Sequence, residues 1–138
     1  MKVDGKGIAI AGILGGIILL IVTFAADALV QMIAPYNLFA LGGMRAVSDP
    51  LMMLYFLYSF IFAVIAALFW ALTKGSFTGS VMRKSFCFGG ILFLLVVLPN
   101  SVVIFSTMDY PAGFHLSNIL TGIIAYPILG YLNVRYNQ

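Results

Sequence analysis

Five polar side chains stand out in a chain that is otherwise strongly apolar, and their types could support proton or cation chemistry. They are Asp27, Asp49, Asn100, Asp109 and His115. A carboxylate at membrane depth is costly unless it is partnered, and it is therefore a candidate carrier of a proton or a cation. An unperturbed imidazole has a pKa of about 6.5, so the single histidine could sense the external pH. These five residues form the candidate polar cluster of the chain.

Other kinds of chemistry have weak support. One His with a few Asp residues would make at best a weak, oxygen-rich metal site, and the chain has a single cysteine. Ser117 lies two residues after His115, but no strand–turn–helix elbow surrounds it to make it a nucleophile. Phosphate-binding glycine loops and the CxxC and H-E-x-x-H motifs are absent. We expect no catalytic residue, no metal and no cofactor.

Four long apolar stretches must position these side chains, and they cover residues 8–33, 51–72, 86–105 and 116–134. Hydrophobic residues make up 63% of the 138 positions and charged residues 8%, whereas a soluble domain carries about 25% charged residues. Each stretch is near or above the ~20 residues that cross a bilayer as a helix. None alternates with the period of a membrane strand. The sequence predicts a single-domain, all-α integral membrane protein with four transmembrane helices in an up-down bundle.

The positive charges predict how this bundle is oriented. Only Arg45 lies on one side of the four spans, and the other six share the opposite side: Lys2, Lys6, Lys74, Arg83, Lys84 and Arg135. Cytoplasmic loops keep Lys and Arg, so both termini are expected to be cytoplasmic, in the cell (inner) membrane. Asp27, Asp49, Asp109 and His115 then lie toward the outer face. The net charge of +3 is dispersed, which argues against nucleic-acid binding.

Asp27 lies nineteen residues beyond Ile8, a rise of about 28 Å along a helix. This places its carboxylate close to the outer boundary of the hydrocarbon. Two interpretations follow: an interfacial acid that reaches headgroup water, or a functional acid with a partner inside the protein. The expected partners are Arg45, His115, Asn118 and Asn100.

Two further features could shape an outer site. Pro99 removes the helical donor for the Leu95 carbonyl, so Pro99–Asn100 predicts a kink that either lines a cavity or packs against a neighbour. The first outer loop, residues 34–50, is the longest connection, and its middle is apolar enough to lie in the interface or dip back as a re-entrant piece. Asp49–Pro50 then predicts the N-cap and first turn of the second span.

Small residues recur at every fourth position of the first two spans. The members of these ladders are Gly12 and Gly16 in the first span and Ser59, Ala63, Ala67 and Ala71 in the second. Four-residue spacing places each set along one helical face. In lipid, helices associate through close approach of such small residues. The ladders therefore predict either packing within the chain or a contact with another subunit.

Three function hypotheses remain open at this point. The first is a non-catalytic accessory or scaffold subunit, with membrane lipids and either its own copies or larger membrane-protein subunits as partners. The second is a small proton- or cation-coupled transporter or channel, which would use Asp27 and the Pro99–Asn100 kink. The third is an enzyme or sensor that acts on lipids or quinones at the outer leaflet through Asp109 and His115.

Overall fold

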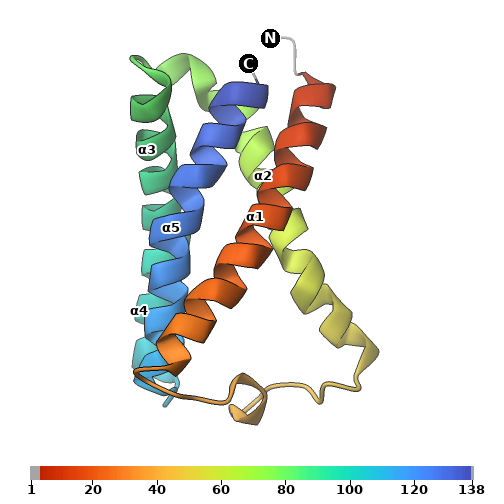
Figure 1. Cartoon of the computed structure of the whole chain (residues 1–138), viewed down its shortest axis with the longest axis vertical. Helices are drawn as coiled ribbons and strands as arrows, with labels where there is room; N and C mark the ends of the chain where they lie inside the picture. The colour runs from red at the N-terminus through yellow and green to blue at the C-terminus, as the bar shows by residue number, and fades with distance from the viewer. Residues whose placement is uncertain (1–3, 138) are drawn as a thin grey trace.

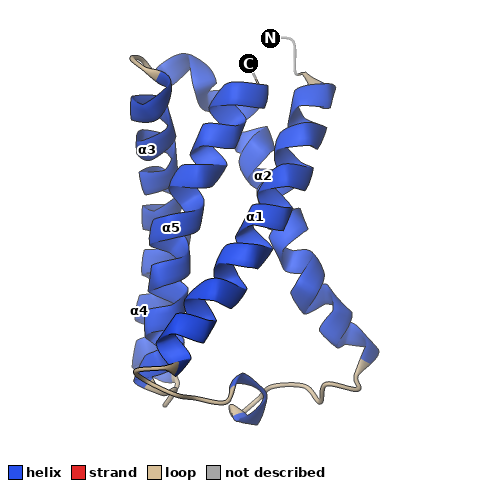
Figure 2. Ribbon diagram, viewed as in Figure 1, coloured by secondary structure: helices blue, strands red, loops and turns tan. Residues whose placement is uncertain are grey.

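The computed structural model describes residues 4–137, and this part of the chain is all-helical, without strands (Figure 2). The long helices are α1 (Gly5–Gln31), α2 (Met53–Thr73), α3 (Val81–Leu92), α4 (Leu98–Thr107) and α5 (Ala112–Tyr136). Short helical turns are η1 (Leu38–Ala40), η2 (Pro50–Met52) and η3 (Lys74–Ser76), and η4 (Phe93–Val97) is a π-helical turn that joins α3 to α4. Four continuous segments are long and apolar enough to cross a membrane: Gly5–Gln31, Pro50–Ser76, Val81–Thr107 and Ala112–Tyr136. They indicate a multi-pass membrane protein.

The helices extend beyond the apolar stretches that predicted them, because polar side chains cap their first turns. The carboxylate of Asp4 accepts from the backbone N–H of Lys6 at 3.1 Å, so α1 begins at Gly5 rather than near residue 8. The hydroxyl of Ser80 accepts from the N–H of Arg83 at 3.3 Å, and α3 begins at Val81 rather than near residue 86. Caps of this kind satisfy backbone donors that an apolar side chain cannot.

Successive spans run in opposite directions (Figure 1). The start of α1, the end of α5 and the α2–α3 connection lie together at what we call the termini end. The α1–α2 loop and the α4–α5 turn lie at the opposite end, called the loop end. α5 packs beside both α1 and α3, whereas α1 and α2 cross and then diverge toward the loop end.

Small side chains make the crossing of α1 and α2 close. Ser59, Ala63, Ala67 and Ala71 are all buried, and Ala67 and Ala71 share a cluster with Ile8 and Ala11 of α1. A Cβ at Gly12 would lie 2.7 Å from a methyl of Val64, and one at Gly16 would overlap the ring of Phe60. Ala67 and Ala71 of the small-residue ladder in the second span are therefore packed against α1 of the same chain.

The seam between α3 and α5 depends on close backbone approach. A Cβ at Gly89 would lie 2.6 Å from the Pro127 nitrogen, and one at Gly130 would overlap the Ser85 carbonyl. Gly122 of α5 lies against η4, and a Cβ added at Gly122 would lie 2.7 Å from a methyl of Val97. The π turn directly precedes Leu98–Pro99, a place where the helical hydrogen-bond ladder has to adjust to the missing proline donor.

Replacing Gly89 by alanine is expected to destabilise the protein by about 1–3 kcal/mol, because the added methyl meets backbone atoms of α5 that cannot rotate away. The matched control is Gly90→Ala, since a Cβ at this neighbouring position has no atom within 4 Å. Both changes add the same helix propensity. Thermal unfolding in detergent should therefore separate them, and equal melting temperatures would contradict this account of the seam.

A buried polar network closes the termini end. The indole N–H of Trp70 donates to the Asn137 carbonyl at 2.9 Å, and the Asn137 amide donates to the Ala67 carbonyl at 2.8 Å. Asn133 and Asn137 are both fully buried, and Trp70 packs against Phe88 with ring centroids 5.1 Å apart. These groups fill the space among α2, α3 and α5 at this end.

Candidate functional site

A cavity of about 630 Å³ lies among the helices on the loop-end side of the bundle. Its walls come from α1, α2, η4, α4 and α5, together with the first part of the α1–α2 loop. It extends from the level of Asp27 to Leu19, Ser59 and Tyr126, which lie near the middle of their spans. The divergence of α1 from α2 makes room for this cavity, and the loop covers part of its boundary.

Asp27 of α1 is the only acidic residue that lines this cavity among the described residues. The Tyr36 hydroxyl donates to its Oδ1 at 2.5 Å, and the Ser117 hydroxyl of α5 lies within hydrogen-bond distance of the same oxygen, at 3.4 Å. The expected partners were Arg45, His115, Asn118 and Asn100, so the observed donors are different. The carboxylate is partnered by neutral hydroxyl groups from the loop and from α5.

Gln31 positions Tyr36 over Asp27. Its side-chain amide donates to the Tyr36 carbonyl at 2.7 Å and accepts from the Tyr36 N–H at 3.0 Å. This paired contact folds the chain back directly after α1. The Tyr36 ring then meets Phe114 edge-on, with centroids 6.2 Å apart. The start of α5 lies very close to this bend, because a Cβ at Gly113 would overlap the Ala34 carbonyl.

Burial and, as the next largest cause, the hydrogen bond to the Asp27 carboxylate together raise the pKa of Tyr36 to about 12. The phenol therefore stays protonated, and able to donate, well above neutral pH. Phenolate absorbance is titrated against pH for the wild type and for Tyr36→Phe, and the second curve is subtracted from the first. The remaining curve, which belongs to Tyr36, should have its midpoint near pH 12 rather than near the ordinary value of about 10. A midpoint near the ordinary value would contradict the contact.

In an Asp27→Asn background the midpoint of Tyr36 should fall, because the acceptor loses its negative charge. It should nevertheless stay above the ordinary value, because burial is the larger cause of the shift. This second titration separates the effect of the carboxylate from the effect of burial.

The middle of the long loop forms one short helical turn, η1. The Asn37 side chain caps this turn by accepting from the Phe39 N–H at 3.1 Å. Leu38 and Phe39 line the cavity. Farther along, the Tyr110 hydroxyl donates to the Gly42 carbonyl at 2.9 Å and ties the loop to the α4–α5 turn. The loop thus forms part of the cavity wall at the loop end.

Of the five polar residues singled out from the sequence, the structure brings Asp27 and Asn100 to the cavity. Asp109 is exposed in the α4–α5 turn. The His115 ring lies between Phe105 and Phe114, with centroids 5.4 Å and 5.7 Å away, and does not line the cavity. The five residues therefore do not form one cluster.

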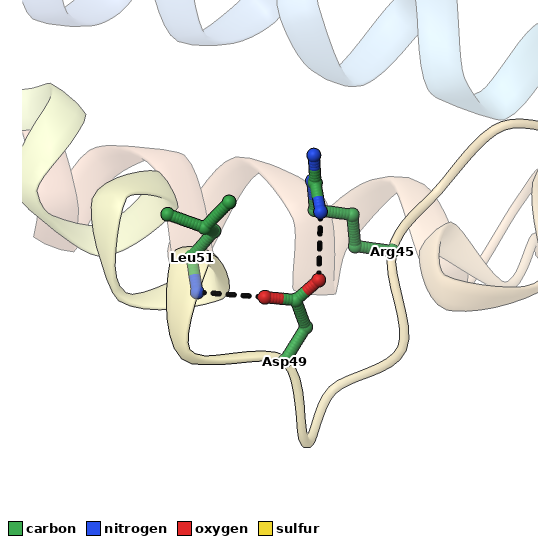
Figure 3. A network of polar contacts seen from close by, with 3 residues as sticks. All are labelled: Arg45, Asp49 and Leu51. Carbon is green, nitrogen blue, oxygen red and sulfur yellow. Dashed lines mark hydrogen bonds and ion pairs between the residues drawn. The ribbon is translucent and has the colours of Figure 1, made fainter.

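Asp49 lies in a separate place, at the start of the second span (Figure 3). Its carboxylate accepts from the Arg45 guanidinium at 2.8 Å and from the Leu51 N–H at 2.9 Å. The hydrogen bond from Arg45 and, to a smaller extent, the hydrogen bond from the Leu51 N–H hold the pKa of this carboxyl below its ordinary value. Pro50 follows as the first helical residue, which confirms the predicted cap. The role of Asp49 is to begin a helix, and it takes Arg45 as its own partner.

Several cavity residues were missed by the sequence reasoning. Thr23 and Gln31 lie four residues before and four residues after Asp27 on α1, and both line the cavity. Helical periodicity could have found this polar stripe. Four of the seven tyrosines also line it: Tyr36, Tyr55, Tyr58 and Tyr126. A tyrosine in a membrane span carries little signal by itself, because its ring is equally suited to packing or to the lipid interface.

The chemistry available in the cavity is that of one carboxylate among hydroxyl, amide and aromatic groups. Over residues 4–137, no Lys, Arg or His lines it, and no group of three His, Cys, Asp or Glu is placed to hold a metal ion. Such a site can exchange a proton at Asp27 or hold a cation beside it. It has no nucleophile paired with a base that would support covalent catalysis.

No protein-family model matches the sequence. Likewise, no curated protein and no solved structure matches this chain.

Proposed function

We propose that this chain is a small membrane transporter in which Asp27 carries the proton or cation that is coupled to movement of a solute. The observation that carries this proposal is a half-buried carboxylate that faces a cavity of about 630 Å³ at the level of the membrane-spanning helices. Asn100 lines the same cavity directly after the π turn and Pro99. Intramembrane acids that face a cavity are typical of proton and ion pathways.

The other titratable groups around Asp27 support its role as the proton carrier. Tyr36 donates to it, Tyr55 lies near enough to interact with it electrostatically, and Tyr58 and Tyr126 line the same cavity. Phenols ordinarily titrate at about pH 10. Among the described lining residues, Asp27 has the only carboxyl group, and it is therefore the acid left to carry a proton.

The positive charges support an orientation for the transporter. Lys6, Lys74, Arg83, Lys84 and Arg135 belong to the termini end, and Arg45 belongs to the loop between α1 and α2. Lys2 lies outside the described residues. By the positive-inside rule the termini end would be cytoplasmic, and the cavity would belong to the outer half of the inner membrane.

The transporter is preferred to the accessory subunit because Ala67 and Ala71 of the ladder that motivated a partner contact pack against α1 of the same chain. It is preferred to the outer-leaflet enzyme because neither Asp109 nor His115 lines the cavity that contains Asp27. Assembly with copies of itself or with other subunits stays a prediction from the sequence.

The proposal can be tested with purified protein in liposomes that contain a pH-sensitive dye. After a pH gradient is imposed, Na⁺, K⁺ or tetraphenylphosphonium is added outside, one at a time. With at least one of these ions, we expect protons to move faster than in protein-free liposomes. Decay of the gradient at the protein-free rate with every one of them would overturn proton-coupled transport of cations.

A further inference from the structure

We propose that the cavity binds hydrophobic organic cations, with Asp27 as the counter-ion and tyrosine rings as the walls. This inference rests on the proposed transporter function and deepens it by naming the class of solute. Three properties of the cavity carry it: its charge, its aromatic lining and its volume.

The charge of the cavity has one sign. Asp27 supplies the only formal charge among the described lining residues, and its hydrogen-bond partners, Tyr36 and Ser117, are neutral. Arg45, which could have compensated Asp27, pairs with Asp49 at 2.8 Å. An ionised carboxylate away from water is stabilised by a positive partner. A ligand with a positive charge would therefore complement this cavity, and an anion would be repelled.

Aromatic rings surround much of the remaining surface. Eight lining residues are aromatic: Phe24, Tyr36, Phe39, Tyr55, Phe56, Tyr58, Phe114 and Tyr126. At the deep end the rings form a stack, since Phe62 lies 6.0 Å from Tyr58 and 5.2 Å from Tyr126 between centroids. Faces of aromatic rings attract cations, most strongly where water is excluded. They also provide the apolar contact area that a hydrophobic cation requires.

The volume selects an organic ion over a bare metal ion. Cavities of roughly 300–1,000 Å³ hold organic ligands of drug size, and this one measures about 630 Å³. A divalent metal ion would need several strong ligands converging on one point. The described residues contain no such group. The site is too large and too aromatic for a metal and has the size and surface for a multi-ring cation.

Tyr36 would compete with the ligand for Asp27. Its hydroxyl donates to the same carboxylate that a bound cation would approach. The Gln31 side chain fixes the Tyr36 backbone through hydrogen bonds with both its N–H and its carbonyl. Removal of this hydroxyl by Tyr36→Phe should leave the ring as part of the wall and free the carboxylate. Cation binding is then expected to become tighter, not weaker.

The decisive experiment compares two ions of the same shape and opposite charge, tetraphenylphosphonium and tetraphenylborate. Saturable binding of each radiolabelled ion to the wild-type protein in nanodiscs is measured against empty nanodiscs. Saturable binding of the cation and none of the anion is expected. Equal binding of both ions, or no saturable cation binding, would overturn the proposal without any need for a variant.

Two variants then locate the site. Asp27→Asn should weaken cation binding by at least about tenfold, because it removes the counter-ion. Tyr58→Leu should weaken it by about threefold to tenfold, the range expected for loss of one cation–π contact. Tyr131→Leu is the matched control, because this tyrosine is exposed on α5 outside the cavity. Unchanged affinity in Asp27→Asn would refute the assignment.

The outcomes separate this inference from the proposed function. If tetraphenylphosphonium binds in an Asp27-dependent way but no proton moves in liposomes, the solute class stands and transport fails. If protons move with Na⁺ or K⁺ while the organic cation shows no saturable binding, transport stands and the solute class is overturned.

Discussion

Replacing Asp27 by asparagine is expected to reduce proton-coupled flux in liposomes to the rate of protein-free vesicles. Asparagine has nearly the same shape and still offers an oxygen to the Tyr36 and Ser117 hydroxyls. It cannot bind or release a proton, and it carries no charge for a cation. Because no other acidic residue lines the cavity within residues 4–137, no neighbouring group can replace this function.

The matched control is Asp109→Asn, the same chemical change at an exposed acid in the α4–α5 turn. It should retain the wild-type flux. Both variants are first checked for a single symmetric peak in gel filtration, so that a loss of flux is not a loss of fold. Wild-type flux in Asp27→Asn, or equal losses in both variants, would show that the cavity is not the pathway.

The helices could be predicted from the sequence because membrane crossing is governed by length and hydropathy alone. Their ends could not be predicted as well, since Asp4 and Ser80 start α1 and α3 through side-chain caps that lie outside the apolar runs. Pro99 correctly marked an irregular place in the third span. The form of that irregularity, a π turn before the proline, depends on packing against Gly122 of α5.

The site was predicted only in part, and the reason is physical. Asp27 could be chosen from its residue type and depth, because a carboxylate at membrane level needs an explanation. Its partner depends on a bend that the Gln31 amide makes around Tyr36. Such a bend follows no periodic pattern. Arg45 forms an ion pair with Asp49, which lies only four residues away. It therefore does not form the long-range ion pair with Asp27 that the sequence had suggested.

Replacing Ala67 by leucine is expected to destabilise the protein by about 3 kcal/mol, at the upper end of the usual cost of overpacking. Ala67 is fully buried in the cluster it forms with Ile8, Ala11 and Ala71, where α1 and α2 cross. Its carbonyl also accepts from the Asn137 amide at 2.8 Å. The larger side chain would force the two helices apart and disturb this contact. The measurement is thermal or denaturant-induced unfolding in detergent micelles.

Ala28→Leu serves as the control, because it is the same substitution at an exposed residue of α1. This pair of variants also decides between the two interpretations of the small-residue ladder. If the ladder packs within the chain, Ala67→Leu lowers the stability of the fold itself, at any protein concentration. If the ladder instead formed a contact between subunits, Ala67→Leu would dissociate an oligomer and leave the unfolding of the monomer unchanged. Ala67 and Ala71 are buried in a cluster with Ile8 and Ala11 of α1, and Ala63 lies against Gly15 of α1. These contacts favour the first result, because this part of the ladder is already covered within the chain.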